Sequence, residues 1–292
     1  MSFEGLLKKK DMTWNCSDLN FWAREEWLPS TPKHVLLYDA FNWEPPRFAH
    51  LPLLLSDQGG KLSKRHADAS VKSFVEAGYQ PEALVNFVAF LGWTPDGKDY
   101  DEVMTMEQLI EHFSLQRVHK GGAAVSRRKL DFLNSKHIER MLSSKDGRAT
   151  LQERFFPFVV HMTKDPEYAL KVLEKIHSRL SPMHEIATKC SYFFRDPDFL
   201  SQEALAFRAK AWREPECSAA LRMLEPRLAD LANWTAGDIS ECVQSLEGSG
   251  LSKSQLMQAL RYKLTGTMVG AGVPETMQVL GKEVVLRRLK SL

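Results

Sequence analysis

The sequence has few of the features that mark secreted, membrane-spanning or metal-binding proteins. It contains four cysteines in 292 residues, and none of them forms a C-x-x-C pair or a Cys/His cluster with zinc spacing. It has no run of 18 apolar residues, so it predicts no membrane-spanning helix. We therefore expect free thiols in a reducing compartment, no metal site and no membrane association.

The first 30 residues also lack the apolar core of a signal peptide. An ordinary mitochondrial transit peptide is poor in acidic residues, whereas this stretch contains Glu4, Asp11, Asp18, Glu25 and Glu26. The length suffices for two domains, and 43% hydrophobic and 26% charged residues are typical of a globular protein. The net charge is only +2, so a nucleic-acid-binding surface would require local clustering of cations.

One such cluster is the pentapeptide Lys61-Leu62-Ser63-Lys64-Arg65, which follows Asp57-Gln58-Gly59-Gly60. Three cations in a glycine-led loop suit a polyphosphate, because ammonium groups stabilise charge that develops on a departing pyrophosphate. The alternative is a solvated basic surface, which is the commoner fate of a charge run.

The residues before this loop predict a short α/β element. Residues 1–23 show no helical or strand period. A helix is predicted from Thr31, with proline in its first turn, to the stop at Pro45-Pro46. Residues 48–55 predict a short buried strand that Pro52 interrupts. The basic loop then follows the carboxyl end of a strand, where open α/β sheets bind their ligands.

From Ser70 onward the pattern predicts helices and almost no strands. Pro81 opens one helix, and Thr105 is the predicted N-cap of another. Changes in the sequence pattern predict domain boundaries near residue 66 and at 142–147. The second boundary is a polar stretch that predicts a loop. Later helices are predicted over about 150–162, 166–179, 182–193, 201–212, 217–232, 236–247, 252–264 and 274–290.

Several segments together resemble bacterial-type glutamyl-tRNA synthetases, a family of class I aminoacyl-tRNA synthetases. The most specific block runs from residue 25 to 93. It contains Glu25-Glu26-Trp27-Leu28-Pro29-Ser30-Thr31-Pro32-Lys33-His34, Phe48 to Leu55, the basic pentapeptide with His66, and Leu91-Gly92-Trp93. The less specific remainder includes Lys129 to Asn134, Tyr192-Phe193-Phe194, Leu264-Thr265-Gly266 and Leu280-Gly281-Lys282-Glu283.

The resemblance implies a mostly α fold with a remnant of a Rossmann-like α/β catalytic domain. We expect an unmatched segment over 1–23 and the carboxyl-terminal part of the catalytic domain over 24–66. A stem-contact region over 67–142 and a helical anticodon-binding domain over 143–292 would follow. The implied reaction activates glutamate with ATP and Mg²⁺ and transfers it to tRNA(Glu).

The resemblance also implies site residues, each with an alternative. Lys64 and Lys61 would be catalytic, and the ATP-binding set would be Lys61, Leu62, Ser63, Lys64, Arg65 and Trp27. Trp27 alone could equally be a core residue. The cations that would contact tRNA phosphates, or else lie on solvated faces, are Arg127, Arg128, Lys129, Arg261, Arg287 and Arg288.

Two elements of the family pattern are missing from the sequence. None of the nine histidines stands in an H-x-G-H pattern, the first class I motif. The arginine that helps the family bind its amino acid is replaced by Ala23. We therefore expect an incomplete ligase, with a catalytically inactive tRNA-binding fragment or isoform as the alternative and a generic helical interaction module as a third interpretation. We expect a monomer in the mitochondrial matrix, with a cytoplasmic location as the alternative.

Overall fold

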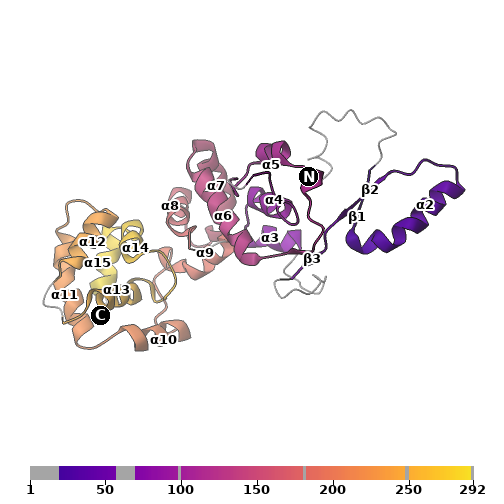
Figure 1. Ribbon diagram of the computed structural model, residues 1–292. Helices are drawn as coiled ribbons and strands as arrows, with labels where there is room; N and C mark the ends of the chain where they lie inside the picture. Colours follow the sequence, from indigo (N-terminus) through magenta and orange to yellow (C-terminus); the bar gives the residue numbers. More distant parts are fainter. Residues whose placement is uncertain (1–19, 57–69, 98–99, 180–181, 247–249, 291–292) are drawn as a thin grey trace. The chain divides into compact units, whose positions relative to one another are not determined.

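The computed structural model describes residues 20–56, 70–97, 100–179, 182–246 and 250–290. The chain divides into two compact units. Unit 1 comprises residues 1–75 and 79–137, and unit 2 comprises residues 76–78 and 138–292. Within the described ranges the chain is mostly helical, as predicted, with its longer strands near the N-terminus (Figure 1).

Unit 1 begins with a parallel βαβ element. Strand β1 (Asn20–Arg24) pairs in parallel with β2 (Arg47–Leu51), from Asn20 opposite Arg47 to Arg24 opposite Leu51. A 3-10 helix, η1 (Glu25–Ser30), and the helix α2 (Thr31–Ala40) connect the two strands. Parallel strands require such a crossover. The predicted helix start at Thr31 is confirmed, and this element is the α/β part of the predicted fold.

Two predictions about strands were wrong in detail, and one short strand was not predicted. Residues 20–23 are not irregular, because they belong to β1. The segment 48–55 is two strands, because Pro52 separates β2 from β3 (Leu54–Leu55). The sequence did not indicate β4 (Ala123–Ala124), which pairs in parallel with β3. A two-residue strand has no readable period, and its formation depends on a partner far away in the sequence.

Local sequence signals correctly predicted where two helices of unit 1 begin. Pro81 does open a helix, and Thr105 does cap one in a capping box with Gln108. The elements are α3 (Val71–Ala77), α4 (Pro81–Ala89), α5 (Met106–His112), η3 (Leu115–Arg117) and α6 (Arg127–Leu142), of which α3 and α6 continue into unit 2.

Buried amides connect these helices. The Oδ1 atom of Asn86 accepts a hydrogen bond from the backbone N–H of Met104 at 2.9 Å and lies 3.0 Å from Nε2 of His137. The Oδ1 atom of Asn134 accepts a hydrogen bond from the N–H of Gln80 at 2.7 Å. Such bonds satisfy buried backbone groups and fix α4 and α6 in one register.

Unit 2 is formed by helices whose positions largely follow the sequence prediction. The segment 182–193 forms two elements rather than one, and the predicted single helix over 274–290 breaks at Gly281, whose φ is 81°. The elements are α7 (Lys145–Val159), α8 (Pro166–Ile176), α9 (Met183–Lys189), η4 (Ser191–Phe193), α10 (Gln202–Ala211), α11 (Glu216–Ala229), α12 (Ala236–Gln244), α13 (Lys253–Thr265), α14 (Val273–Leu280) and α15 (Lys282–Lys290).

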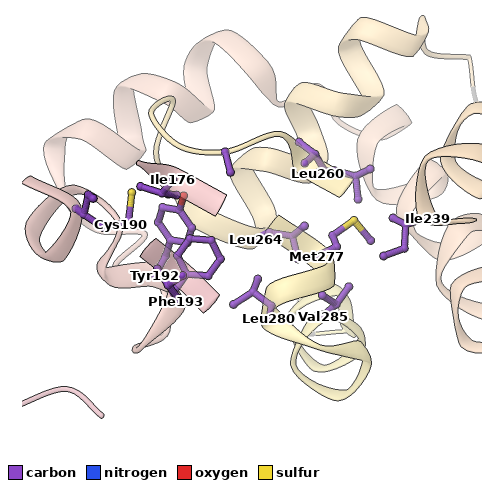
Figure 2. Close-up of a cluster of buried hydrophobic side chains, with 14 of the residues drawn as sticks. Ile176, Cys190, Tyr192, Phe193, Ile239, Leu260, Leu264, Met277, Leu280 and Val285 are labelled. Atoms are coloured by element: carbon purple, nitrogen blue, oxygen red, sulfur yellow. The ribbon is translucent and has the colours of Figure 1, made fainter. Parts of the chain in front are cut away.

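One large apolar core holds unit 2 together. It joins side chains from helices that are distant in the sequence, and Figure 2 shows Tyr192 and Phe193 near Leu264, with Met277 and Ile239 further along the same core. Burial of these side chains is the main source of the unit's stability. Within the described ranges, no helix has both the length and the apolar character needed to cross a membrane.

The predicted polar loop at 143–147 is mostly helix. Ser144 is an N-cap whose hydroxyl oxygen accepts a hydrogen bond from the N–H of Gly147 at 3.1 Å, and α7 starts at Lys145. Gly147 lies in the first turn of α7, where a Cβ atom would overlap the carbonyl oxygen of Met141. The glycine therefore permits a close approach of α6 and α7 rather than a loop.

This close approach gives a stability prediction. Gly147→Ala is expected to lower the free energy of unfolding by about 1–3 kcal/mol, because the methyl group must displace backbone. Gly237→Ala is the matched control in α12, where the nearest atom to a new Cβ is the Thr235 hydroxyl at 3.7 Å. Alanine there should raise stability by about 0.4–1 kcal/mol. Urea unfolding of both variants checks this, and equal stabilities would contradict it.

Candidate functional site

The basic pentapeptide at residues 61–65 lies outside the described residues. The last described element before it is β3, which pairs with β4. The N–H of Ala123 donates to the carbonyl of Leu53 at 2.8 Å, and the N–H of Val125 donates to the carbonyl of Leu55 at 2.9 Å. A Cβ on Gly122 would lie 2.6 Å from a methyl group of Leu55, so glycine is what lets the strands approach. Strand β3 is therefore held by β4.

Trp27 lies at the turn between β1 and α2, and its side chain is 54% exposed. Its carbonyl oxygen accepts hydrogen bonds from the hydroxyls of Ser30 at 2.8 Å and Thr31 at 3.1 Å. Its ring meets the ring of His34 edge-on, with 6.5 Å between centroids. With this exposure Trp27 is not a core residue of unit 1. Its predicted contact with ATP stays a prediction.

A pocket of about 340 Å³ lies beside the same turn. Apolar side chains such as Leu28 and Pro52 line it together with His50, His119 and Lys120. The Thr31 hydroxyl lies 3.2 Å from Nε2 of His50. No sequence pattern indicated these three polar residues as a site, because His50 is far from the other two in the sequence and only the fold brings them to one pocket. A cation and two imidazoles at an apolar pocket suit a partly apolar, anionic group.

The predicted basic edge at the start of α6 is on the surface. Arg127 and Arg128 are exposed. The Arg127 guanidinium lies over the rings of Phe74 and Tyr79, at 5.4 Å and 5.0 Å from their centroids. Lys129 forms an ion pair of 2.5 Å with Glu102. The edge therefore presents two guanidinium groups to solvent, while part of its charge is neutralised by an acidic neighbour.

The Tyr79 hydroxyl positions this edge. It donates a hydrogen bond of 2.5 Å to Oδ1 of Asp131 on α6. Burial, and then the hydrogen bond to this carboxylate, raise the pKa of Tyr79 well above its ordinary value. The phenol therefore stays protonated and keeps the first turns of α6 next to the residues that precede α4.

The three arginines predicted in unit 2 have different surroundings. Arg288 is only 5% exposed and donates hydrogen bonds to the carbonyl oxygens of Leu264 at 2.7 Å, Tyr192 at 2.8 Å and Arg195 at 2.9 Å. Arg261 is half-buried and donates to the carbonyl oxygen of Ala271 at 2.8 Å. These contacts give both side chains a structural task, and their predicted contacts with tRNA phosphates stay predictions.

Arg287 remains more accessible. Its Nη1 and Nη2 atoms donate to the two carboxylate oxygens of Asp196 at 2.7 Å and 2.9 Å, and its side chain is 57% exposed. The hydrogen bond from Arg287 is the main cause that lowers the pKa of Asp196. The structure thus places Arg287 at the surface of unit 2 and Arg127 to Lys129 in unit 1. Among the described residues, no group of acidic, histidine or cysteine side chains could hold a metal ion.

Two family models match the chain in succession. Residues 21–132 match the model described as "tRNA synthetases class I (E and Q), catalytic domain". Residues 150–292 match the model described as "Anticodon binding domain". The first match includes the βαβ element, the basic pentapeptide and the basic edge of α6. The second match covers most of unit 2.

Three similar proteins are glutamate–tRNA ligases. The glutamate–tRNA ligases of Chlorobium luteolum and Chlorobaculum parvum are 38% and 39% identical to this chain over 274 and 273 residues, which is 91% of this chain and 54% of each relative. That of Moorella thermoacetica is 35% identical over 274 residues. The chain therefore spans about half the length of the curated relatives it matches.

Two solved structures of glutamate–tRNA ligases are also similar to this chain. A crystal structure of a glutamate tRNA ligase from Elizabethkingia meningosepticum, in complex with its amino acid, matches with a TM-score of 0.71 and 32% identity, over 92% of this chain and 56% of that one. The glutamate–tRNA synthetase of Elizabethkingia anophelis matches with a TM-score of 0.66 and the same identity.

Proposed function

Because this chain belongs to the glutamyl-tRNA synthetase family of class I aminoacyl-tRNA synthetases, we propose that it serves the ATP-dependent activation of glutamate and its transfer to tRNA(Glu). The observation that carries the proposal is the order of the two matches. Catalytic-domain sequence precedes anticodon-binding sequence in one chain, and the relatives that match 91% of it are glutamate–tRNA ligases.

In this proposal the basic pentapeptide acts on the phosphates of ATP. Lys64, with Lys61 and Arg65 beside it, would stabilise the charge that develops as pyrophosphate leaves. Mg²⁺ would enter with ATP as part of the substrate complex. Trp27, at the turn after β1, would contact the nucleotide. These cations lower the barrier most if they are held in place before the reaction.

Unit 2 and the basic edge of α6 would hold the tRNA. Cations such as Arg128 and Arg287 would contact phosphates, which adds affinity without sequence preference. Discrimination would come from side chains that reach unpaired anticodon bases.

The second candidate is a tRNA-binding chain without ligase activity. The observation that favours it is that the 292 residues contain no H-x-G-H pattern, while Ala23 replaces the arginine that the family uses for its amino acid. Glutamate-dependent exchange of pyrophosphate into ATP by the purified chain separates the two. Exchange supports the ligase, and tRNA binding without exchange supports the second candidate. Neither exchange nor binding at low salt would exclude both.

The basic edge gives a prediction for binding. Arg128→Ala is expected to weaken binding of tRNA(Glu) several-fold and to reduce the slope of log K against log salt by about 1, because one phosphate contact is lost. Lys33→Ala, which removes an exposed cation on α2 in unit 1, is the matched control and should change neither value. Filter binding at several salt concentrations measures both. An unchanged slope for Arg128→Ala would remove this residue from the interface.

We also propose a monomer that works in the mitochondrial matrix, with the cytoplasm as the alternative. The support for the compartment is the similarity to bacterial ligases at 35–39% identity. Imaging of the tagged protein with a matrix marker tests the compartment, and sedimentation equilibrium tests the monomer. A nuclear or secreted protein, or a concentration-independent dimer, would contradict the respective proposal.

A further inference from the structure

Three cations stand in the first turn of α6, where helix formation does not favour them. Arg127, Arg128 and Lys129 begin the helix, and its first turn contains no acidic residue. The positive end of a helix dipole lies at the N-terminus, so cations at this end lower the stability of the helix. Residues that break such a local rule commonly serve function rather than folding.

Arg127 and Lys129 differ in the partners of their charged groups. The ammonium group of Lys129 forms an ion pair with Glu102. Arg127 forms no ion pair among the described residues, and its guanidinium lies over the rings of Phe74 and Tyr79 instead. An aromatic face attracts a cation without neutralising its charge. Arg127 is therefore held near the surface of unit 1 while its charge stays available to an anion.

The two rings under Arg127 are themselves fixed. Phe74 and Tyr79 meet edge-on, with 5.6 Å between centroids and 82° between ring planes. The N–H of Tyr79 also donates to the carbonyl oxygen of Phe74 at 3.1 Å. Tyr79 is only 6% exposed, and its hydroxyl donates to Asp131, one turn after Arg127 in α6. The rings are thus fixed to each other and to the helix that carries the arginine.

Such support matters for a long cationic side chain that binds a phosphate. A guanidinium group matches a phosphate because it can donate two parallel hydrogen bonds. A mobile arginine loses rotamer freedom when it makes this contact, whereas one that is already held in place loses less. Arg127 is exposed, as a contact with a large anionic partner requires.

We propose that Phe74 and Tyr79 are positioning residues for RNA binding, which hold Arg127 in the place from which it contacts a phosphate of tRNA(Glu). This inference rests on the proposed function, because it names residues that would prepare this chain for the tRNA. It assigns the two rings a task besides packing in unit 1, and this task depends on the presence of Arg127.

The test measures the affinity of the full chain for tRNA(Glu) by filter binding at several salt concentrations. Arg127→Ala is expected to weaken binding about 10-fold and to reduce the slope of log K against log salt by about 1. Phe74→Leu should weaken binding about 3-fold, because the arginine must then become ordered on binding. It should leave the slope unchanged, because the number of cations that meet phosphates is the same.

Phe90→Leu is the matched control for the loss of a ring. Phe90 is also a half-buried phenylalanine of unit 1, but its ring packs against the rings of Trp93 and Tyr100. Its affinity for tRNA(Glu) should equal that of the unaltered chain.

The combination of Phe74→Leu with Arg127→Ala separates positioning from packing. The double variant should bind no more weakly than Arg127→Ala alone, because Phe74 then has no arginine to hold. Independent effects that multiply to about 30-fold would mean that Phe74 acts by packing, and they would overturn the inference. An unchanged affinity of Phe74→Leu would overturn it as well.

Tyr79→Phe is the second variant, and it decides the case if Phe74→Leu does not fold by circular dichroism. It keeps the ring and removes only the hydroxyl that bonds to Asp131. A loss of affinity that occurs only when Arg127 is present supports the inference, and an equal effect with and without Arg127 overturns it. Absence of tRNA binding by the unaltered chain at low salt would contradict the proposed function and this inference together, whereas the outcomes above overturn the inference alone.

Discussion

Arg288→Ala is expected to lower the free energy of unfolding of unit 2 by about 3–5 kcal/mol. The substitution leaves the carbonyl oxygens of Leu264 and Tyr192, which are buried, and that of Arg195 without this donor, and each buried group left unpaired costs about 1–3 kcal/mol. A domain is stable by only about 5–15 kcal/mol, so the loss is a large share of the total. Urea unfolding followed by far-ultraviolet circular dichroism measures it.

Arg287→Ala is the matched control for this experiment. The two arginines are adjacent and share Asp196, but the Arg287 side chain is 57% exposed whereas Arg288 is enclosed. The control should unfold close to the unaltered chain. Arg288→Lys should recover only part of the stability, because one ammonium group cannot reach three separate carbonyl groups. If Arg288→Ala unfolded at the same urea concentration as the control, the structural task assigned to Arg288 would be wrong.

Lys64→Ala is expected to lower kcat/KM for glutamate-dependent pyrophosphate exchange about 100- to 1,000-fold. A preorganised group that stabilises charge only in the transition state has an effect of this size. The assay uses this chain fused behind the part of the Chlorobium luteolum ligase that it does not match, so that the fusion spans the full length of that ligase. Affinity for tRNA(Glu) should not change.

Lys171→Ala controls for the loss of one lysine, because Lys171 is exposed on α8 in unit 2. Its exchange rate should equal that of the unaltered fusion. A Lys64→Ala rate within a factor of about three of the control would mean that the pentapeptide is a solvated basic surface, the alternative that its composition left open.

The sequence predicted the helices of this chain better than its strands, and the reason is locality. Thr105 and Pro81 act on the turn that they begin, so their capping roles can be read from a few residues. β4 consists of Ala123–Ala124 and exists only because β3 lies beside it. Its partner is almost 70 residues away, and no local pattern contains that information.

A glycine residue does not by itself predict where a helix of this chain ends. The break between α14 and α15 falls at Gly281, whose φ of 81° suits glycine, although the apolar pattern around it reads as one helix. Gly147 has the opposite effect, because a polar stretch with glycine reads as a loop while the residue lies inside α7. The nearness of the Met141 carbonyl group explains why glycine is needed at residue 147. This nearness is a property of the packed structure and cannot be seen in the sequence.

Only those parts of the candidate site that lie within one contiguous sequence motif could be predicted. The pentapeptide and the basic edge of α6 are contiguous in the sequence and could be recognised there. The burial of Arg288 and the pocket that joins His50 to His119 depend on tertiary packing. From the sequence, Arg288 therefore had the same interpretation as the exposed Arg287. The fold, not the motif, separates a structural arginine from an accessible one.

The most direct test of the account is the affinity of the purified chain for tRNA(Glu) compared with a tRNA(Glu) transcript whose three anticodon bases are replaced. The two RNAs have the same length and number of phosphates, so contacts to the backbone are equal for both. The account predicts salt-dependent binding of both and a preference of about 10-fold or more for the natural anticodon, because part of the interface reads unpaired bases. Equal affinities, or no binding at low salt, would contradict it.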